Sequence, residues 1–301
     1  MSASSSADGS PERQVCVVTG ANSGIGRATA VHLAESGYTV FGTVRSAAKA
    51  DKLNTAAAAA GVVVELVELD IADDTSVGTG FAAIVDRAGR VDHLVNNAGV
   101  GGNGVVEETT PQRMLEVLNV DVCGGLRCIR EVLPGMRKRR AGTIVNITSV
   151  AGRIGAVAQA PYVASKWAFE GLSEQLAHEV AAFGVRVAIV EPGVTKSSIF
   201  AKNTDAPNSS GAYAMQYERM FQMYAAGYLN ATDAIEVARV VRHAIETDEP
   251  RLRYPVSWGG RELVEGRARM ADSDWVALGR EAPLSDYIQA FEGAFGLDLR
   301  A

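Results

Sequence analysis

Apolar residues recur along the chain in short runs that alternate with longer helical patterns. Seven runs rich in valine, isoleucine and leucine predict strands, at residues 15–19, 38–44, 62–69, 93–97, 142–149, 185–190 and 252–256. Most of them lack a strict apolar–polar alternation, as expected for strands that are covered on both faces. Between them, helical periodicity predicts helices at residues 24–36, 47–60, 75–88, 111–139, 161–183 and 232–247. This order predicts an α/β fold with a doubly wound, mainly parallel seven-stranded sheet and helices on both faces.

The alternation also predicts how the chain is organised. No linker divides residues 14–258, which we expect to form a single domain, and residues 1–13 are serine-rich and polar, typical of a flexible leader. Residues 194–230 interrupt the alternation as an insertion that contains a Met- and Tyr-rich stretch. The spacing of that stretch fits ordinary core packing as well as a wall against a ligand. Residues 259–301 predict a C-terminal helical extension.

Composition and charge exclude several classes of function. The chain has 301 residues and a formal net charge of −6, so it offers no broad basic surface for nucleic acid. No apolar stretch approaches the ~20 residues that a membrane helix needs, so we expect no membrane association. The three cysteines are an odd number, which favours a reducing, cytoplasmic compartment. Neither they nor the four histidines have metal-ligand spacing, so we expect no metal.

A glycine-rich turn follows the first predicted strand, where residues 19–26 read Thr-Gly-Ala-Asn-Ser-Gly-Ile-Gly. Glycines allow the backbone to turn tightly and approach a pyrophosphate, and the following helix presents free N–H groups to the anion. The sequence therefore predicts a dinucleotide site whose turn residues are Gly20, Asn22, Ser23, Gly24, Ile25 and Gly26.

The end of the second predicted strand bears on the choice of cofactor. An NAD site of this type usually has an acid here to bind the adenosine ribose, but the chain reads Val44-Arg45. Arg45 is suited to pair with a 2′-phosphate, although a solvated charge at the start of a helix explains it too. We therefore predict NADP(H) in preference to NAD(H).

Tyr162 and Lys166 stand four residues apart, one turn along a predicted helix, and so share one face of it. A neighbouring ammonium favours the phenolate form of a tyrosine, which could then exchange a proton with an alcohol or ketone as a hydride moves to or from nicotinamide. Ser149, at the carboxyl end of a predicted strand, is placed to hydrogen-bond the same oxygen. Alone, such a Tyr/Lys pair is common on helix surfaces.

Several motifs together favour a catalytic Tyr/Lys pair over an ordinary surface pair. They are the turn at residues 19–26, Asn96-Asn97-Ala98-Gly99, Asn119, Ser149, the segment 162–166 and Pro192-Gly193. In order and spacing these motifs resemble the short-chain dehydrogenase/reductase family over residues 14–196, with a faint similarity to its hydroxysteroid and retinol dehydrogenases. The resemblance implies a Rossmann-type fold and an oxidoreductase.

The resemblance also implies roles for single residues. Asn119 would bend its helix through its carbonyl and help to hold a proton-relay water. Ser149 would orient the substrate, Tyr162 would act as acid and base, and Lys166 would tune Tyr162 and hold the nicotinamide ribose. Asn96 and Gly99 would support the central sheet and approach the cofactor. Further cofactor contacts are implied for Asp70, Ala98, Pro192, Gly193 and Thr195.

The family pattern further implies a bulky apolar substrate and an assembly of subunits. The insertion 194–230 would close over a steroid, retinoid, terpenoid or polyketide carbonyl, and the helices 111–139 and 161–183 would pair in a homodimer or homotetramer. The leading hypothesis is an NADP(H)-dependent enzyme that interconverts a secondary alcohol and a ketone or aldehyde. A dinucleotide-binding redox sensor without turnover, and an epimerase or dehydratase on the same scaffold, stay open as alternatives.

Overall fold

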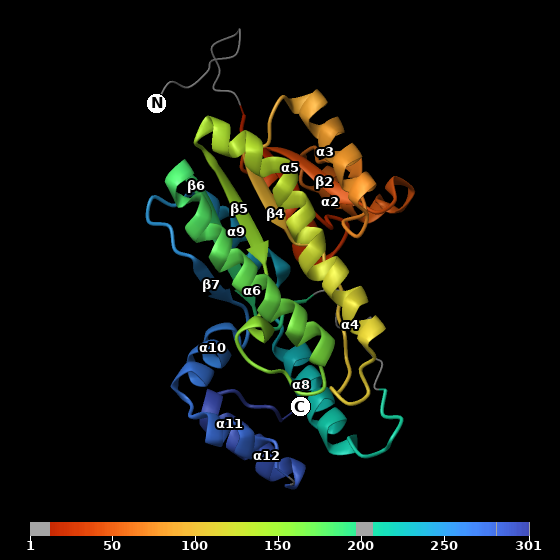
Figure 1. Ribbon diagram of the computed structural model, residues 1–301, viewed down its shortest axis with the longest axis vertical. Helices are drawn as coiled ribbons and strands as arrows, with labels where there is room; N and C mark the ends of the chain where they lie inside the picture. The colour runs from red at the N-terminus through yellow and green to blue at the C-terminus, as the bar shows by residue number, and fades with distance from the viewer. Residues whose placement is uncertain (1–12, 197–206, 281, 301) are drawn as a thin grey trace.

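A seven-stranded parallel sheet lies at the centre of the protein in the computed structural model, which describes residues 13–196, 207–280 and 282–300 (Figure 1). The strand order is β3-β2-β1-β4-β5-β6-β7, and each of the six neighbouring pairs is parallel. The strands are β1 (Val15–Val18), β2 (Thr39–Val44), β3 (Glu65–Glu68), β4 (His93–Asn96), β5 (Gly142–Ile147), β6 (Val185–Pro192) and β7 (Arg253–Val256). This order confirms the doubly wound Rossmann-type sheet predicted from the sequence.

Helices cover both faces of the sheet, so the five strands between the edge strands β3 and β7 are buried on two sides. One face packs against α1 (Gly24–Glu35), α2 (Asp51–Ala59) and α9 (Ala234–Glu246), and the other against α3 (Asp74–Ala88), α5 (Gly124–Arg139) and α6 (Ala160–Val180). Within β1, Val15 and Val17 pack toward α3, α5 and α6, whereas Cys16 and Val18 pack toward α1, α2 and α9. Two buried faces explain why these strands are apolar at nearly every position.

The helix predicted at 111–139 is interrupted. It consists of α4 (Pro111–Leu118), a π-helical turn η2 (Asn119–Cys123) and α5, and the N–H of Gly124 donates to the carbonyl of Asn119 across that turn. The apolar positions continue through the turn, so periodicity does not reveal the extra residue. Short 3₁₀ turns flank other helices: η1 (Ala47–Lys49) precedes α2, η3 (Val150–Gly152) follows β5, and η4 (Ala181–Phe183) follows α6.

Four further helices gather beside the carboxyl ends of the strands (Figure 1). They are α8 (Ala214–Asn230), α10 (Gly260–Arg269), α11 (Asp272–Leu278) and α12 (Leu284–Phe295). A third apolar cluster joins Ala226 of α8 to Leu263 of α10 and to Phe291 of α12. The helical extension predicted at 259–301 thus packs against the insertion predicted at 194–230. Residues 1–12 of the expected leader and residues 197–206 of the insertion lie outside the described residues.

Candidate active site

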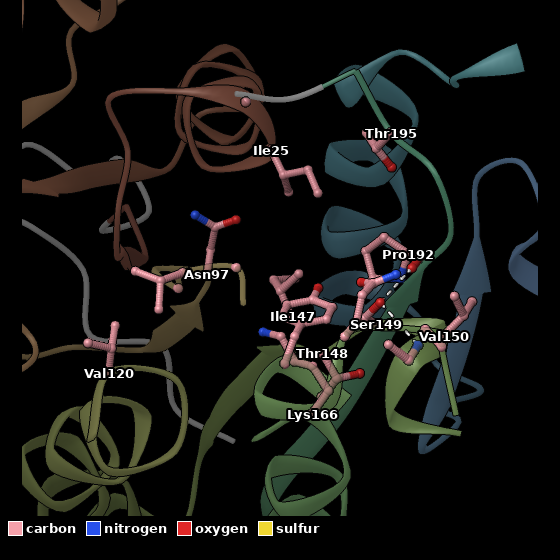
Figure 2. A pocket seen from close by; sticks show the side chains of 18 of the residues that line it. Ile25, Asn97, Val120, Ile147, Thr148, Ser149, Val150, Lys166, Pro192 and Thr195 are labelled. Carbon is pink, nitrogen blue, oxygen red and sulfur yellow. Dashed lines mark hydrogen bonds between the residues drawn. The ribbon is translucent and has the colours of Figure 1, made fainter. Parts of the chain in front are cut away.

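A cavity of about 1690 Å³ runs along the edge of the sheet where the strands end. It is lined by residues that follow β1, β2, β3, β4, β5 and β6, and by residues of α6, α8 and the C-terminal helices. In a parallel sheet all carboxyl ends meet at one edge, so one cavity collects side chains from distant parts of the chain. Figure 2 shows Ile25 and Asn97 on one side of it, and Ser149, Pro192 and Thr195 on the other.

The glycine turn after β1 approaches the loop after β4 too closely for other side chains. Gly20 has a φ of +67°, and a Cβ on Gly26 would lie 2.4 Å from both the Gly20 carbonyl oxygen and Asn97 Nδ2. Asn97 Nδ2 donates to the Thr19 carbonyl at 2.9 Å, and Thr19 Oγ1 accepts from the Asn97 N–H at 2.9 Å. These bonds hold the turn against the β4 loop. Gly20, Asn22, Ser23, Gly24 and Ile25 line the cavity as expected, while Gly26 lies behind them.

Asn96 supports the sheet, as the resemblance implies, but it does not line the cavity that it was expected to approach. Asn96 is buried at the end of β4, where its Nδ2 donates to Asn146 Oδ1 at 2.9 Å, inside the sheet. Successive strand residues point to opposite sides, so Asn97 and not Asn96 lines the cavity, followed by Ala98 and Gly99. Asn97 belongs to the sequence motif without a predicted role, although the same alternation along the strand could have assigned it to the cavity.

Basic residues border the end of the cavity beyond β2. Arg45, Lys49 and Lys52 line it, together with the carboxylate residues Asp51 and Asp70. Arg45 is exposed where β2 ends. The Asn22 amide donates to the Lys49 carbonyl at 2.6 Å, which ties the glycine turn to this basic segment. Lys49 and Lys52 were absent from the sequence prediction because helical periodicity does not show which charges face a cavity.

The segment after β6 is held against the chain that follows β7. A Cβ on Gly193 would lie 2.1 Å from the carbonyl oxygen of Trp258, so only glycine fits there. The Gly193 N–H donates to the Val256 carbonyl at 2.8 Å, and Thr195 Oγ1 lies 2.8 Å from Ser257 Oγ. Pro192, Gly193 and Thr195 all line the cavity, as the motif predicts.

Ser149, Tyr162 and Lys166 line the same cavity from β5 and α6. Ser149 caps η3, where its Oγ accepts the Ala151 N–H at 3.2 Å and donates to the Pro192 carbonyl at 3.4 Å (Figure 2). Lys166 Nζ lies 5.4 Å from the centre of the Tyr162 ring. The four-residue spacing therefore brings an ammonium and a phenol together, as the helical geometry requires.

Lys166 is buried and paired with an acid. Its Nζ lies 3.6 Å from Asp121 Oδ2, with side-chain exposures of 7% and 0%. Burial disfavours the ammonium, but attraction to Asp121 outweighs it, with further contributions from Tyr162 and Glu170, and the pKa of Lys166 is raised. Lys166 is therefore cationic at neutral pH.

The structure places Asn119 away from Lys166. Its Oδ1 accepts from Arg127 at 2.9 Å, and its Nδ2 lies 3.4 Å from the Ala72 carbonyl. The carbonyl of Asn119 does begin the π-helical turn, as a residue that bends its helix would. The side chain that reaches Lys166 from this turn is Asp121, which the sequence analysis missed. A lone acid between the apolar residues Val120 and Val122 is the signal that could have found it.

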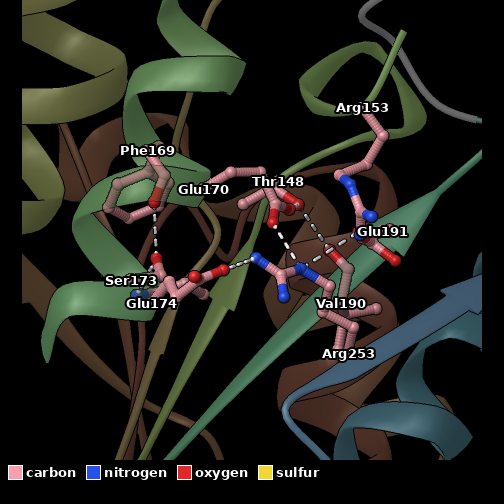
Figure 3. A network of polar contacts seen from close by, with 10 residues as sticks. Thr148, Arg153, Phe169, Glu170, Ser173, Glu174, Val190, Glu191 and Arg253 are labelled. Carbon is pink, nitrogen blue, oxygen red and sulfur yellow. Dashed lines mark hydrogen bonds and ion pairs between the residues drawn. The ribbon is translucent and has the colours of Figure 1, made fainter. Parts of the chain in front are cut away.

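A network of charges surrounds Thr148, the residue that precedes Ser149 (Figure 3). Thr148 Oγ1 donates to Glu170 at 2.6 Å, and Arg253 Nε donates to the same carboxylate at 3.0 Å. Arg153 donates to Glu191 at 2.8 Å, and Glu191 precedes Pro192. Burial and the nearby Glu170 raise the pKa of Glu191. The network joins the segment directly after β5, which contains Ser149, to the end of β6, which contains Pro192.

The far end of the cavity is lined mainly by apolar side chains from α8 and the C-terminal helices. Met223 and Tyr224 of the predicted Met/Tyr stretch line it, whereas Tyr217 and Met220 pack in a core cluster. Leu263, Trp275, Val276, Leu278, Tyr287 and Phe291 also line this part of the cavity, together with the polar side chains of Gln216 and Arg219. One part of the insertion therefore packs as core, and another part lines the cavity. The contribution of the C-terminal helices was not predicted, because nothing in their sequence marks a cavity.

A family model described as short chain dehydrogenase matches residues 14–208. This protein belongs to that family. The match confirms the resemblance drawn from the motifs, and the chain is accordingly an oxidoreductase. Within residues 13–196, 207–280 and 282–300, this short-chain dehydrogenase has no group of three acids, cysteines or histidines that could hold a metal ion, and no helix long and apolar enough to cross a membrane.

Relatives of this short-chain dehydrogenase match it over most of its length. Estradiol 17-beta-dehydrogenase 1 of Rattus norvegicus is 36% identical over 295 residues, which cover 93% of this chain and 84% of the rat protein. The crystal structure of a short-chain dehydrogenase from Streptomyces avermitilis superposes with a TM-score of 0.77 at 34% identity, covering 94% and 99% of the two chains. A metagenomic short-chain oxidoreductase in complex with NADP gives a TM-score of 0.65 at 28% identity, covering 81% and 96%.

Proposed function

We propose that this short-chain dehydrogenase is an NADP(H)-dependent enzyme that interconverts a secondary alcohol and a ketone or aldehyde. The observation that carries the proposal is that Ser149, Tyr162 and Lys166 line the same cavity as the glycine turn. A phenol, a cation and a hydroxyl group therefore lie where a substrate oxygen can meet a bound dinucleotide.

The shape of the cavity supports a dinucleotide. Gly20 and Gly193 stand where a Cβ would meet other parts of the chain at 2.9 Å and 2.1 Å, so the backbone itself forms the wall. The first turn of α1 borders the cavity and presents N–H groups suited to a pyrophosphate. Asp70, which follows β3 and lines the cavity, is the carboxylate proposed to contact the adenine end, and its Oδ1 accepts the Ala72 N–H at 3.0 Å.

The side chains divide the chemistry between them. When bound, the nicotinamide supplies or accepts the hydride. During reduction the Tyr162 hydroxyl donates a proton to the carbonyl oxygen, and during oxidation the phenolate takes that proton back. Ser149 turns its hydroxyl from the Pro192 carbonyl to the same oxygen, and the Lys166 ammonium favours the phenolate and holds the ribose.

The preference for NADP(H) rests on the basic end of the cavity. Arg45 follows β2 directly, at the place where an acid would bind the ribose of NAD, and Lys49 and Lys52 add positive charge. An arginine fork there suits a 2′-phosphate. The NADP complex of the metagenomic relative supports the same choice.

The substrate is proposed to be bulky and apolar, such as a steroid, retinoid, terpenoid or polyketide carbonyl. Met223, Trp275 and Phe291 offer an extended apolar wall, to which Tyr224 adds a hydroxyl group. A flexible methionine beside rigid rings suits a large apolar ligand. The similarity to the rat estradiol dehydrogenase supports this class.

We also propose a homodimer or homotetramer that assembles through α4, α5 and α6. Leu115, Leu126, Trp167 and Phe183 are exposed by 60%, 38%, 50% and 37% on or beside these helices, and exposed apolar side chains of this kind favour an interface. A cytoplasmic location is proposed as well. Its support is that Cys16, Cys123 and Cys128 are free thiols, which suits a reducing compartment.

The test replaces Tyr162 by phenylalanine and follows NADPH consumption against a panel of ketones and aldehydes that includes steroids. We expect turnover to fall by about 10²- to 10⁴-fold, because the proton donor is lost, while NADPH binding by calorimetry stays unchanged. Tyr228→Phe is the matched control, since Tyr228 is 79% exposed. A wild-type protein that binds NADPH but never consumes it would support the redox sensor instead.

A further inference from the structure

A buried carboxylate contacts the proposed lysine from a direction that the mechanism above does not use. Asp121 lies in the π-helical turn η2, and its side chain is completely buried. Its Oδ1 accepts the Val100 N–H at 2.8 Å, and its Oδ2 lies 3.6 Å from Lys166 Nζ. The Ser165 hydroxyl lies 3.1 Å from the same Oδ2. Asp121 is thus held from three sides.

We propose that Asp121 is a positioning residue that fixes the Lys166 ammonium through a buried ion pair and thereby sets the pH range in which Tyr162 exchanges its proton. The proposal rests on the proposed function, in which Lys166 tunes Tyr162. Asp121 itself does not line the cavity and acts only through the lysine.

The charges explain the direction of the effect. The ammonium favours a phenolate at Tyr162, whose ring centre lies 5.4 Å from Lys166 Nζ. A carboxylate 3.6 Å from the same ammonium offsets much of its positive field, because charges in a buried site are poorly screened. A neutral amide at position 121 would keep a hydrogen-bond acceptor for Lys166, and Tyr162 and Glu170 would still favour its ammonium form. The positive field of Lys166 at Tyr162 would then lack the compensating charge of Asp121.

Other groups that face this pair do not replace Asp121. Glu170 lies one turn further along α6 and adds a weaker attraction to Lys166, since it is already bound by Thr148 and Arg253. Tyr224 of α8 is the phenol that lies near Tyr162 from the opposite wall, and burial raises its pKa. Tyr224 is therefore neutral where the enzyme works, which leaves Asp121 as the main acid beside Lys166 in the part of the chain described.

The experiment compares Asp121→Asn with the wild-type enzyme in both directions of the reaction across pH. Oxidation needs the phenolate, so its rate rises with pH. Without the Asp121 charge the phenolate is favoured. We expect the pH of half-maximal kcat to fall by about one unit, the lower end of the effect of a directly neighbouring charge, because Asp121 acts on Tyr162 across Lys166. The pH above which the rate of reduction declines should fall as well. Asp74→Asn is the control, since it removes an equal charge that is 76% exposed and pairs with Arg127.

An unchanged pH profile in a folded, active Asp121→Asn enzyme would overturn the inference. A fall of kcat by the same factor at every pH would overturn it too. A wild-type enzyme without turnover refutes the proposed function instead, so the two failures are distinct. If Asp121→Asn does not fold, the test compares the free energy of unfolding of Lys166→Met with that of the double variant Lys166→Met/Asp121→Asn. The ion pair predicts that the double variant is more stable than Lys166→Met, because a lone buried charge costs more than none; equal or lower stability would overturn it.

Discussion

Replacing Gly26 by alanine tests whether the glycine turn is as close to the β4 loop as the structure indicates. Gly26 lies inside α1, where its φ is ordinary for a helix, so backbone strain does not enter. The added Cβ would lie 2.4 Å from the Gly20 carbonyl oxygen and 2.4 Å from Asn97 Nδ2. Both positions are about 1 Å inside an ordinary contact of roughly 3.5 Å. The carbonyl and the amide must therefore move.

Two effects of opposite sign determine the size of the change. Alanine favours a helix over glycine by about 1 kcal/mol. Overpacking costs about 1–3 kcal/mol, and the shift of Asn97 weakens its 2.9 Å bond to the Thr19 carbonyl, which contributes about 1 kcal/mol. We expect Gly26→Ala to lower the free energy of unfolding by roughly 1–2 kcal/mol net. Nucleotide affinity should fall by about tenfold or more, since a loss of about 1.4 kcal/mol in binding corresponds to that factor.

Urea unfolding and calorimetric titration with NADP⁺ measure the two quantities. Gly78→Ala provides the control, because Gly78 also lies in a helix, α3, but has no atom within 4 Å of an added Cβ. Gly78→Ala should gain up to about 1 kcal/mol of stability and bind nucleotide normally. The reasoning is refuted if Gly26→Ala gains stability like the control and binds NADP⁺ as tightly as the wild type.

Two further predictions concern charge. Arg45→Ala should raise the KM for NADP(H) by about tenfold or more, because a charge-assisted bond contributes about 1.5–3 kcal/mol, and should leave the KM for NAD(H) nearly unchanged; equal effects on both would contradict a 2′-phosphate contact. His93 is 5% exposed, and burial lowers its pKa from 6.5 to about 4. As the pH falls, His93 therefore takes up a proton at a higher pH in the unfolded chain than in the folded one. The free energy of unfolding falls as the pH decreases between these two pKa values. Urea unfolding should show that the free energy of unfolding falls by roughly 2 kcal/mol between about pH 6.5 and about pH 4.5 because of this histidine. His93→Gln should remove that part of the pH dependence. A His93→Gln protein with the same pH dependence as wild type would rule out this histidine as the cause.

The architecture followed from the sequence because its signals are local and repeated. Seven apolar runs and the helices between them suffice to order a parallel sheet, and a parallel sheet fixes which ends of the strands meet. The sequence alone therefore predicts that the glycine turn, Ser149 and Pro192 meet at one edge of the sheet. The wall formed by Trp275 and Phe291 could not be predicted, since it depends on how the C-terminal helices fold back, and their apolar positions fit a core equally well.

Asp121, and not Asn119, contacts Lys166, which shows a second limit of prediction from sequence. A motif identifies residue types in order along the chain, whereas contact with Lys166 depends on the angle at which a side chain leaves its helix. The π-helical turn adds one residue to the turn that contains both positions, so Asn119 faces Arg127 while Asp121 faces Lys166. The asparagine fitted the motif by its type, and the aspartate satisfies the geometry. A carboxylate in place of an amide beside Lys166 changes the charge that Tyr162 senses, and for that reason the pH profile, more than the rate alone, is where this member of the family should differ.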